Sequence, residues 1–280
     1  MINGLAAWHY PHRTLIENVA FFAEKGFSAV SLLGKRTVIA CQDEDVAKEL
    51  ASVVKEKNIV LTVHFKLPDT HGSADVEEFK TAIDILADWQ KKYGGLISVL
   101  SFDVPQDIRD NILPYVEYVL GYEEFKKVAV EDFGLTDDEK RQIEPLKNNE
   151  RFGFLIDIGH MYIRLRGENK EGKTLFENRP SECEVKDKPE FDDFIQAFNS
   201  KEFPIFEIHL HNNDGVDDVH FFLDDGTLDV GMIADVLKAI EYDGILTLEC
   251  APGFKFECKY PESDERILKN FEYWKSLFEK

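Results

Sequence analysis

The chain has 280 residues, 44% of them hydrophobic, and a formal net charge of −21. Its 22 phenylalanines can build a sizeable core, so a disordered chain is not expected. A surface this acidic repels phosphate backbones, which disfavours nucleic acid as a partner. No apolar run reaches the roughly 18 residues of a membrane span. The four cysteines form no CxxC motif and no signal peptide is evident, so we expect a cytoplasmic protein.

Short apolar segments alternate with amphipathic segments along the chain. The sequence predicts strands at 2–7, 27–33, 58–65, 96–102, 127–133, 152–160, 203–211 and 244–250. It predicts helices at 13–25, 43–57, 74–92, 106–120, 136–147, 188–200, 231–242 and 262–279. Apolar strands that alternate with helices are typical of a parallel sheet covered on both faces.

Eight such strand–helix units predict a closed (β/α)8 barrel, a TIM barrel, as a single domain over residues 1–280. The alternative is an open doubly wound sheet, but the dinucleotide and phosphate fingerprints GxGxxG and GxxxxGK[ST] are absent. The charged segment 161–190 is too long for an ordinary connection in a compact domain. We interpret it as a loop insertion over the active face, after the sixth strand.

Side chains that can bind metals stand at the carboxyl ends of the predicted strands. In chain order they are His64, Glu131, Asp157, His160, His209, His211 and Glu249. In a barrel these strand ends meet at the face where catalytic residues lie. Burying unpaired carboxylates there is costly, and a cation offsets that cost. Mixed nitrogen and oxygen donors without thiolates favour Mn²⁺, Mg²⁺, Co²⁺ or Zn²⁺ over a structural zinc site.

Four short motifs carry a resemblance to a known family: VEDF, LIDIGH, IHLHNND with the following DDVH, and LTLEC. They resemble the xylose isomerase-like TIM-barrel superfamily, which includes ketose epimerases, hydroxypyruvate isomerase, inosose dehydratase and endonuclease IV. The resemblance implies a divalent metal, with the ligands Glu131, Asp157, His211 and Glu249. It favours His211 over His209 as the ligand, because the family's histidine precedes an acidic residue by three positions. His160 is implied to contact the substrate or a second metal.

The resemblance also implies a reaction, the isomerisation or epimerisation of a small sugar, sugar phosphate or related hydroxy-carbonyl compound. The metal polarises the carbonyl, so the neighbouring carbon-bound hydrogen becomes acidic. One glutamate removes this proton to give an enediolate, and a second glutamate returns it. Glu131 and Glu249 lie on different strands and fit these two roles. Four residues follow the first strand, either as an aromatic, polar wall for a small polyol or as a packed loop: Trp8, His9, Tyr10 and His12.

The pair Asp218 and His220 keeps a second function open. Endonuclease IV has such an Asp-x-His pair, which binds an additional zinc with the histidine after the sixth strand, and His64 fits another histidine of that enzyme. Its trinuclear site also needs a histidine after the fourth strand, where this chain has Asp103. A metal-dependent phosphodiesterase and a non-catalytic metal- or ligand-binding barrel therefore remain alternatives. The sequence leaves the oligomeric state, the substrate and the identity of the metal open.

Overall fold

The computed structural model describes residues 1–132, 137–166, 188–215, 218–251 and 260–279. The strands in these residues are parallel and close into a barrel in the order β1 to β8, with β8 hydrogen-bonded to β1. They are β1 (Ile2–Ala6), β2 (Ala29–Leu33), β3 (Val60–Lys66), β4 (Ile97–Asp103), β5 (Val128–Glu131), β6 (Phe152–Asp157), β7 (Ile205–Leu210) and β8 (Ile245–Leu248). The predicted (β/α)8 barrel is confirmed.

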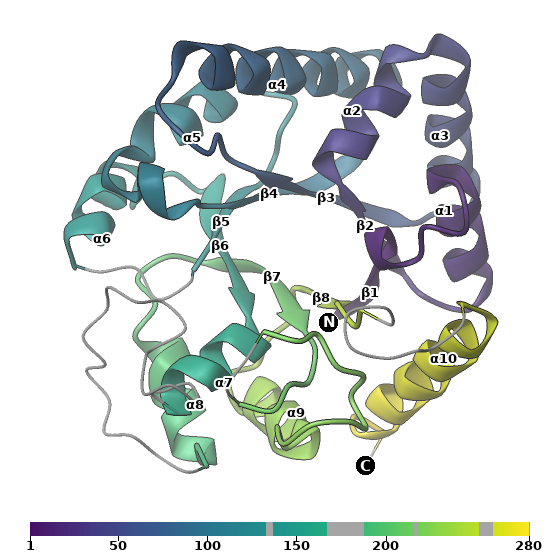
Figure 1. Ribbon diagram of the computed structural model, residues 1–280, viewed down its shortest axis with the longest axis vertical. Coiled ribbons are helices and arrows are strands. Elements are labelled where there is room, and N and C mark those ends of the chain that lie inside the picture. Colours follow the sequence, from purple (N-terminus) through teal and green to yellow (C-terminus); the bar gives the residue numbers. More distant parts are fainter. Residues whose placement is uncertain (133–136, 167–187, 216–217, 252–259, 280) are drawn as a thin grey trace.

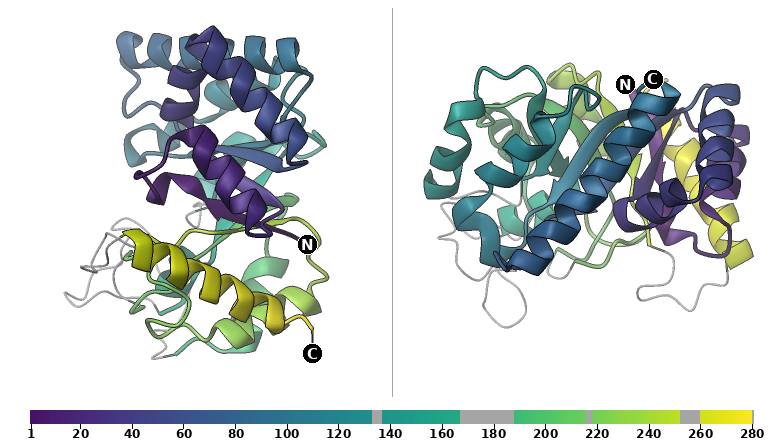
Figure 2. Two further views of the ribbon diagram at one scale, coloured as in Figure 1. Left: turned by 90° about the vertical axis from the view of Figure 1, so that its right-hand side faces the viewer. Right: turned by 90° about the horizontal axis from the view of Figure 1, so that it is seen from above.

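Helices surround the strands on the outside of the barrel (Figure 1). They are α1 (Leu15–Glu24), α2 (Gly34–Gln42), α3 (Glu44–Glu56), α4 (Ser73–Tyr93), α5 (Leu113–Leu120), α6 (Asp137–Ile143), α7 (Ile158–Arg166), α8 (Phe191–Asn199), α9 (Val230–Ala239) and α10 (Tyr260–Ser276). Short 3-10 helices lie at η1 (Ala7–His9), η2 (Gln106–Asn111) and η3 (Glu144–Leu146). The long α4 runs along one side of the barrel (Figure 2). Among the described helices, none is both long and apolar enough to cross a membrane.

The structure corrects the sequence prediction around β6. The strand ends at Asp157, and α7 begins with the next residue, so His160 lies in the first turn of a helix. The predicted insertion at 161–190 therefore starts too early, because its first six residues complete α7. Residues 167–187 lie outside the described part of the chain.

Helix α2 was not predicted from the sequence. It follows β2 without a connecting loop and begins at Gly34. A β-carbon at Gly34 would lie 1.7 Å from the ring of Phe65 on β3, so only glycine allows this close approach. The composition of α2 gives little helical signal, and the contact with β3 could not be read from the sequence.

The barrel interior becomes more polar along the strands. Alternate residues of a strand share one face. A small interior cluster of buried side chains includes Ala29, Val99, Ala129, Leu155 and Ile245. Two residues further along the same strands come Ser31, Ser101, Glu131, Asp157 and Thr247, each at most 3% exposed. The apolar layer thus supports a buried polar layer at the mouth of the barrel. A larger apolar cluster joins residues of the strands to residues of the surrounding helices.

Candidate metal centre at the barrel mouth

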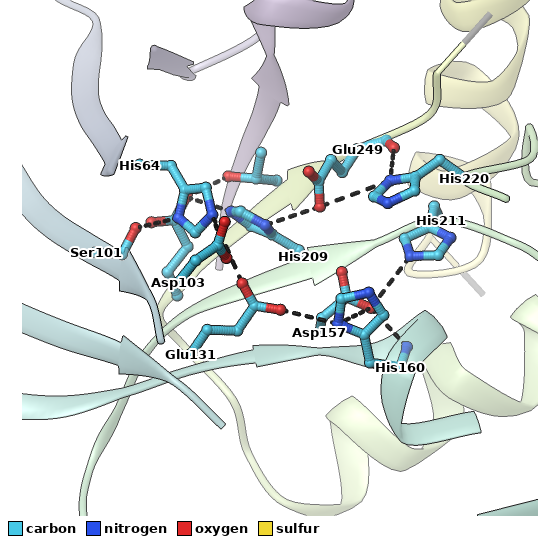
Figure 3. A network of polar contacts seen from close by, with 12 residues as sticks. His64, Ser101, Asp103, Glu131, Asp157, His160, His209, His211, His220 and Glu249 are labelled. Atoms are coloured by element: carbon cyan, nitrogen blue, oxygen red, sulfur yellow. Dashed lines mark hydrogen bonds and ion pairs between the residues drawn. The ribbon is translucent and has the colours of Figure 1, made fainter. Parts of the chain in front are cut away.

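The carboxyl ends of the strands bring the predicted site residues together at one face. Figure 3 shows His64, Ser101, Asp103, Glu131, Asp157, His160, His209, His211, His220 and Glu249. Asp218 joins them, with its Oδ2 3.1 Å from Nε2 of His160. All the candidate residues inferred from the sequence are therefore part of one network.

The central group consists of Asp157, His209 and Glu249, whose potential ligand atoms all lie within 4.8 Å of one another. Nδ1 of His209 is 2.9 Å from Oε2 of Glu249. Oδ2 of Asp157 is buried without a hydrogen-bond partner among the described residues. Both ring nitrogens of His209 are also buried and face carboxylate oxygens of Glu249 and Glu207, but neither contact has hydrogen-bond geometry. Glu131 and His160 form a further group with Asp157, so Asp157 links the two sets.

The outer group consists of His160, His211, Asp218 and His220. The rings of His211 and His220 stack with centroids 4.0 Å apart. Oδ1 of Asp218 lies 3.2 Å from Nε2 of His220 and 3.6 Å from Nε2 of His211. The backbone of His220 is left-handed, with φ of 47°, and its Nδ1 donates to the main-chain oxygen of Glu249 at 3.0 Å. The loop after β7 thus returns to the end of β8.

The early group consists of His64, Asp103 and Glu131. Nδ1 of His64 lies 3.0 Å from Oγ of Ser101, and Nε2 lies 3.0 Å from Oδ1 of Asp103. This is not a serine nucleophile with its base, since Ser101 is 0% exposed and no substrate reaches a hydroxyl buried beneath the site. Ser101 instead fixes the ring of His64. Asp103 offers a ligand at the end of β4, the position where the trinuclear site of endonuclease IV needs a histidine.

The four metal ligands that the resemblance implied belong to different groups in the structure. Glu131 and Asp157 group with His160, whereas Asp157 and Glu249 group with His209. His211 belongs to the outer group, although its Nε2 is 3.2 Å from Oδ1 of Asp157. The physical reason is that β7 ends at Leu210, so His209 points into the barrel while His211 already follows the loop. This geometry favours His209 over His211 as the partner of both carboxylates.

The two glutamates have opposite electrostatic environments in the metal-free protein. Burial raises the pKa of Glu131, and the charge of Asp103 raises it further, to about 8. Burial also acts on Glu249, but the charges of His209 and His220 outweigh it and hold the pKa of Glu249 well below its usual range. At neutral pH Glu131 therefore keeps a proton and Glu249 is ionised.

Trp8 and His9 of η1 close the site on the side of β1. The Trp8 ring stacks on His64 with centroids 5.7 Å apart, and Nε2 of His9 is 3.7 Å from Oε1 of Glu249. The sequence left open whether these residues line the site or pack in a loop. Their contacts with His64 and Glu249 place them at the site.

Comparisons with known proteins agree with this fold. A family model described as "Xylose isomerase-like TIM barrel" matches residues 19–277. The chain belongs to this family. A curated relative, the uncharacterized protein MJ1311 of Methanocaldococcus jannaschii, is 25% identical over 116 residues, which are 41% of this chain and 31% of that protein. The match thus spans less than a third of that relative's length.

Two solved structures have a similar fold. A D-allulose 3-epimerase from Methylomonas sp. is 13% identical with a TM-score of 0.68, and the alignment covers 99% of this chain and 98% of that one. An AP endonuclease, family 2, from Brucella melitensis is 14% identical with a TM-score of 0.58, covering 94% and 95%. At these identities the similarity shows a shared fold and no more.

Proposed function

We propose that the protein is a divalent-metal-dependent isomerase or epimerase of a small sugar, sugar phosphate or related hydroxy-carbonyl compound. One observation carries this proposal: two buried glutamates on different strands, Glu131 and Glu249, each share a potential ligand group with Asp157. The sugar epimerases among the structures with the same fold support it.

The donor atoms of the central group fit a divalent cation. A buried polar atom without a hydrogen bond costs about 1–3 kcal/mol, and Asp157 and His209 both contain such atoms. Oxygen and nitrogen donors without a thiolate suit Mn²⁺, Mg²⁺, Co²⁺ or Zn²⁺. We assign Asp157, His209, Glu249 and Glu131 as the residues that would hold it, with His209 in place of His211. When bound, the cation would polarise the carbonyl of the substrate.

Glu131 and Glu249 would move the proton. Glu131 ends β5 and Glu249 directly follows β8, so the two side chains enter the network from the ends of different strands (Figure 3). One carboxylate accepts the carbon-bound proton next to the carbonyl, and the other carboxyl group donates a proton to the enediolate. Opposite pKa shifts are typical of an acid–base pair. His160 would orient Glu131, because its Nδ1 lies 2.9 Å from Oε1 of Glu131.

The test is the exchange of substrate hydrogen with D₂O across a panel of ketoses and their phosphates. Glu131→Gln and Glu249→Gln should each reduce the exchange rate by a factor of about 10²–10⁴, the contribution of a positioned acid or base. Glu24→Gln is the control, since Glu24 ends the outer helix α1, its side chain is 62% exposed, and it pairs with Lys57 away from the site. Exchange at the native rate in either site variant would rule out the two-glutamate mechanism.

A second candidate, a metal-dependent phosphodiesterase of the endonuclease IV type, is favoured by the early and outer groups. They add potential ligand sets on both sides of the central group, and Asp103 supplies the ligand at the end of β4. The net charge of −21 opposes a nucleic-acid substrate. Metal analysis separates the two: one cation per chain fits the isomerase, and three fit the phosphodiesterase. Cleavage of an abasic-site duplex that is lost in His220→Ala would decide for the phosphodiesterase. Metal and ligand binding without turnover on any substrate would indicate a binding protein.

A further inference from the structure

Glu207 is a buried carboxylate that the proposed reaction does not use. It precedes His209 by two residues on β7, so both side chains point into the barrel. Glu207 is 0% exposed. Its Oε1 accepts hydrogen bonds from Oγ1 of Thr62 at 3.0 Å and Oγ1 of Thr247 at 2.6 Å. Its Oε2 has no hydrogen-bond partner within the part of the chain that the structure describes.

Besides the two threonine hydroxyls, the buried carboxyl group of Glu207 faces the ring of His209. Nε2 of His209 lies 3.5 Å from Oε1 of Glu207. The opposite ring nitrogen, Nδ1, faces Glu249 at 2.9 Å. The ring of His209 thus lies between Glu249 and Glu207.

The two histidines that follow β7, His211 and His220, have different neighbours at Nδ1. Nδ1 of His211 donates to the main-chain oxygen of Asn212 at 3.1 Å, and Nδ1 of His220 donates to that of Glu249. These acceptors are neutral carbonyl groups. At His209 a buried carboxylate stands on the side of the ring that faces away from Glu249.

We infer that Glu207 is a positioning residue for His209. Placed 3.5 Å from Nε2, the carboxylate would favour a proton on that nitrogen and so select the tautomer whose Nδ1 keeps a free electron pair for the cation of the central group. A carboxylate behind a ligating histidine also fixes the ring and raises its basicity, and its loss typically weakens metal binding 10–100-fold. Thr62 on β3 and Thr247 on β8 hold this carboxylate in place. The inference rests on the proposed function, because it takes His209 as a metal ligand.

The experiment measures the affinity of the full chain for Co²⁺ and Zn²⁺ by chelator competition, and the visible spectrum of the Co²⁺ form. Glu207→Gln keeps the size of the side chain, and its amide oxygen still accepts from both threonines, but the charge is lost. We expect 10–100-fold weaker binding and an altered Co²⁺ spectrum, with the melting temperature of the metal-free protein unchanged or higher. A purely structural role would leave both metal readouts unchanged.

Thr247→Val is the second variant, because it frees the carboxylate from its shorter hydrogen bond. It should weaken metal binding several-fold. The control is Thr37→Val, which removes the hydroxyl of a buried threonine in α2 that donates to the main-chain oxygen of Leu33; this variant should bind metal like the native protein. Native affinity and a native Co²⁺ spectrum in Glu207→Gln would overturn the inference, as would native affinity in Thr247→Val if Glu207→Gln does not fold. Failure of the unaltered protein to bind any divalent cation would instead overturn the proposed function, and the inference with it.

Discussion

The lower interior of the barrel and its mouth are lined by the same strands at positions only two residues apart. On β6, Leu155 belongs to the apolar interior cluster, whereas Asp157 belongs to the central group. On β5, Ala129 belongs to the same apolar cluster, whereas Glu131 belongs to a potential ligand group with Asp157 and His160. Both layers are buried, but burial has opposite consequences for them. It stabilises apolar side chains by about 25 cal/mol per Å², and it penalises charges unless partners or a cation offset the cost.

The comparison assigns the two layers separate tasks. The interior cluster should contribute to the free energy of unfolding without influencing the metal. The mouth should govern metal binding and chemistry while contributing little to stability, because its carboxylates and imidazoles offset each other's burial. Substitutions at matched positions of one strand can test this division.

Leu155→Ala should have the largest effect on stability. Leu155 is fully buried, and truncating such a leucine costs about 2–5 kcal/mol. Urea unfolding of the metal-free protein measures this loss, and Ile39→Ala, at a 60% exposed position, should change the free energy by at most about 0.5 kcal/mol. The affinity for Co²⁺ should stay within about threefold of native, since ligand geometry is set two residues further on. A larger loss of affinity would show that the layers are not separate.

Asp157→Asn should show the opposite behaviour. The amide oxygen can still accept from the main-chain N–H of His160, which lies 2.8 Å from Oδ1 of Asp157. The variant loses a charged ligand that two groups share. Loss of a residue that only supports a ligand weakens metal binding by at most roughly 100-fold, or about 2.7 kcal/mol of binding free energy, and the loss in Asp157→Asn should be larger. Chelator competition measures the affinity. A variant that binds Co²⁺ within tenfold of native would exclude Asp157 as a ligand.

Much of the fold could be predicted because each strand carries its own signal. Apolar runs such as FGFLID identify strands without tertiary information, and eight such runs alternating with helices specify a barrel. The end of β6 could not be located, since Ile158 and Gly159 continue the apolar pattern although they already form α7. Helix α2 depends on a contact between Gly34 and Phe65 that no local pattern reveals.

The site could be located from the sequence but not divided into groups. Polar residues at strand ends predicted one face, and the structure brings them together there. Assigning His209 or His211 required knowing where β7 ends and how Asn212 pairs with Phe221 in the following loop. Glu207 did leave a signal, a charged residue inside the apolar strand FPIFEIHL, but its partners Thr62 and Thr247 come from distant parts of the chain.

The pH dependence of metal binding should sharpen the contrast further. Burial lowers the pKa of His209, but the charges of Glu249 and Glu207 outweigh it and raise the pKa well above 6.5. At neutral pH the metal-free protein therefore holds a proton on this ring, and the cation must displace it. Apparent affinity should rise about tenfold from pH 7 to pH 8 for each proton released. Calorimetry in buffers of different ionisation enthalpy counts these protons, and a pH-independent affinity would contradict the assignment.

The stability of the metal-free protein should change in the opposite direction. Burial lowers the pKa of His64, yet the charge of Asp103 outweighs it and the pKa is raised to about 9. A pKa that is higher in the folded than in the unfolded protein stabilises the fold. This stabilisation is fully present below the unfolded value of 6.5 and is lost as the pH rises through 9. The melting temperature of the metal-free protein should therefore fall between pH 7 and pH 10. The fall should be smaller in His64→Gln but not absent, because the pKa values of His160, His209 and His220 are also raised.

Ser101→Ala should produce the smallest effect, because it removes a single hydrogen bond from a buried side chain of the polar layer. Its hydroxyl is 3.0 Å from Nδ1 of His64 and fixes that ring beneath the early group. Removing it should destabilise the metal-free protein by about 1 kcal/mol, the net value of one hydrogen bond. Ser31→Ala is the matched control, since Ser31 is equally buried but its hydroxyl has no hydrogen-bond partner among the described residues. That substitution should be neutral or slightly stabilising, because it removes a polar atom whose burial is not offset. Equal losses of stability in the two variants would show that the bond between Ser101 and His64 contributes nothing, and that the ring of His64 is held by Asp103 alone.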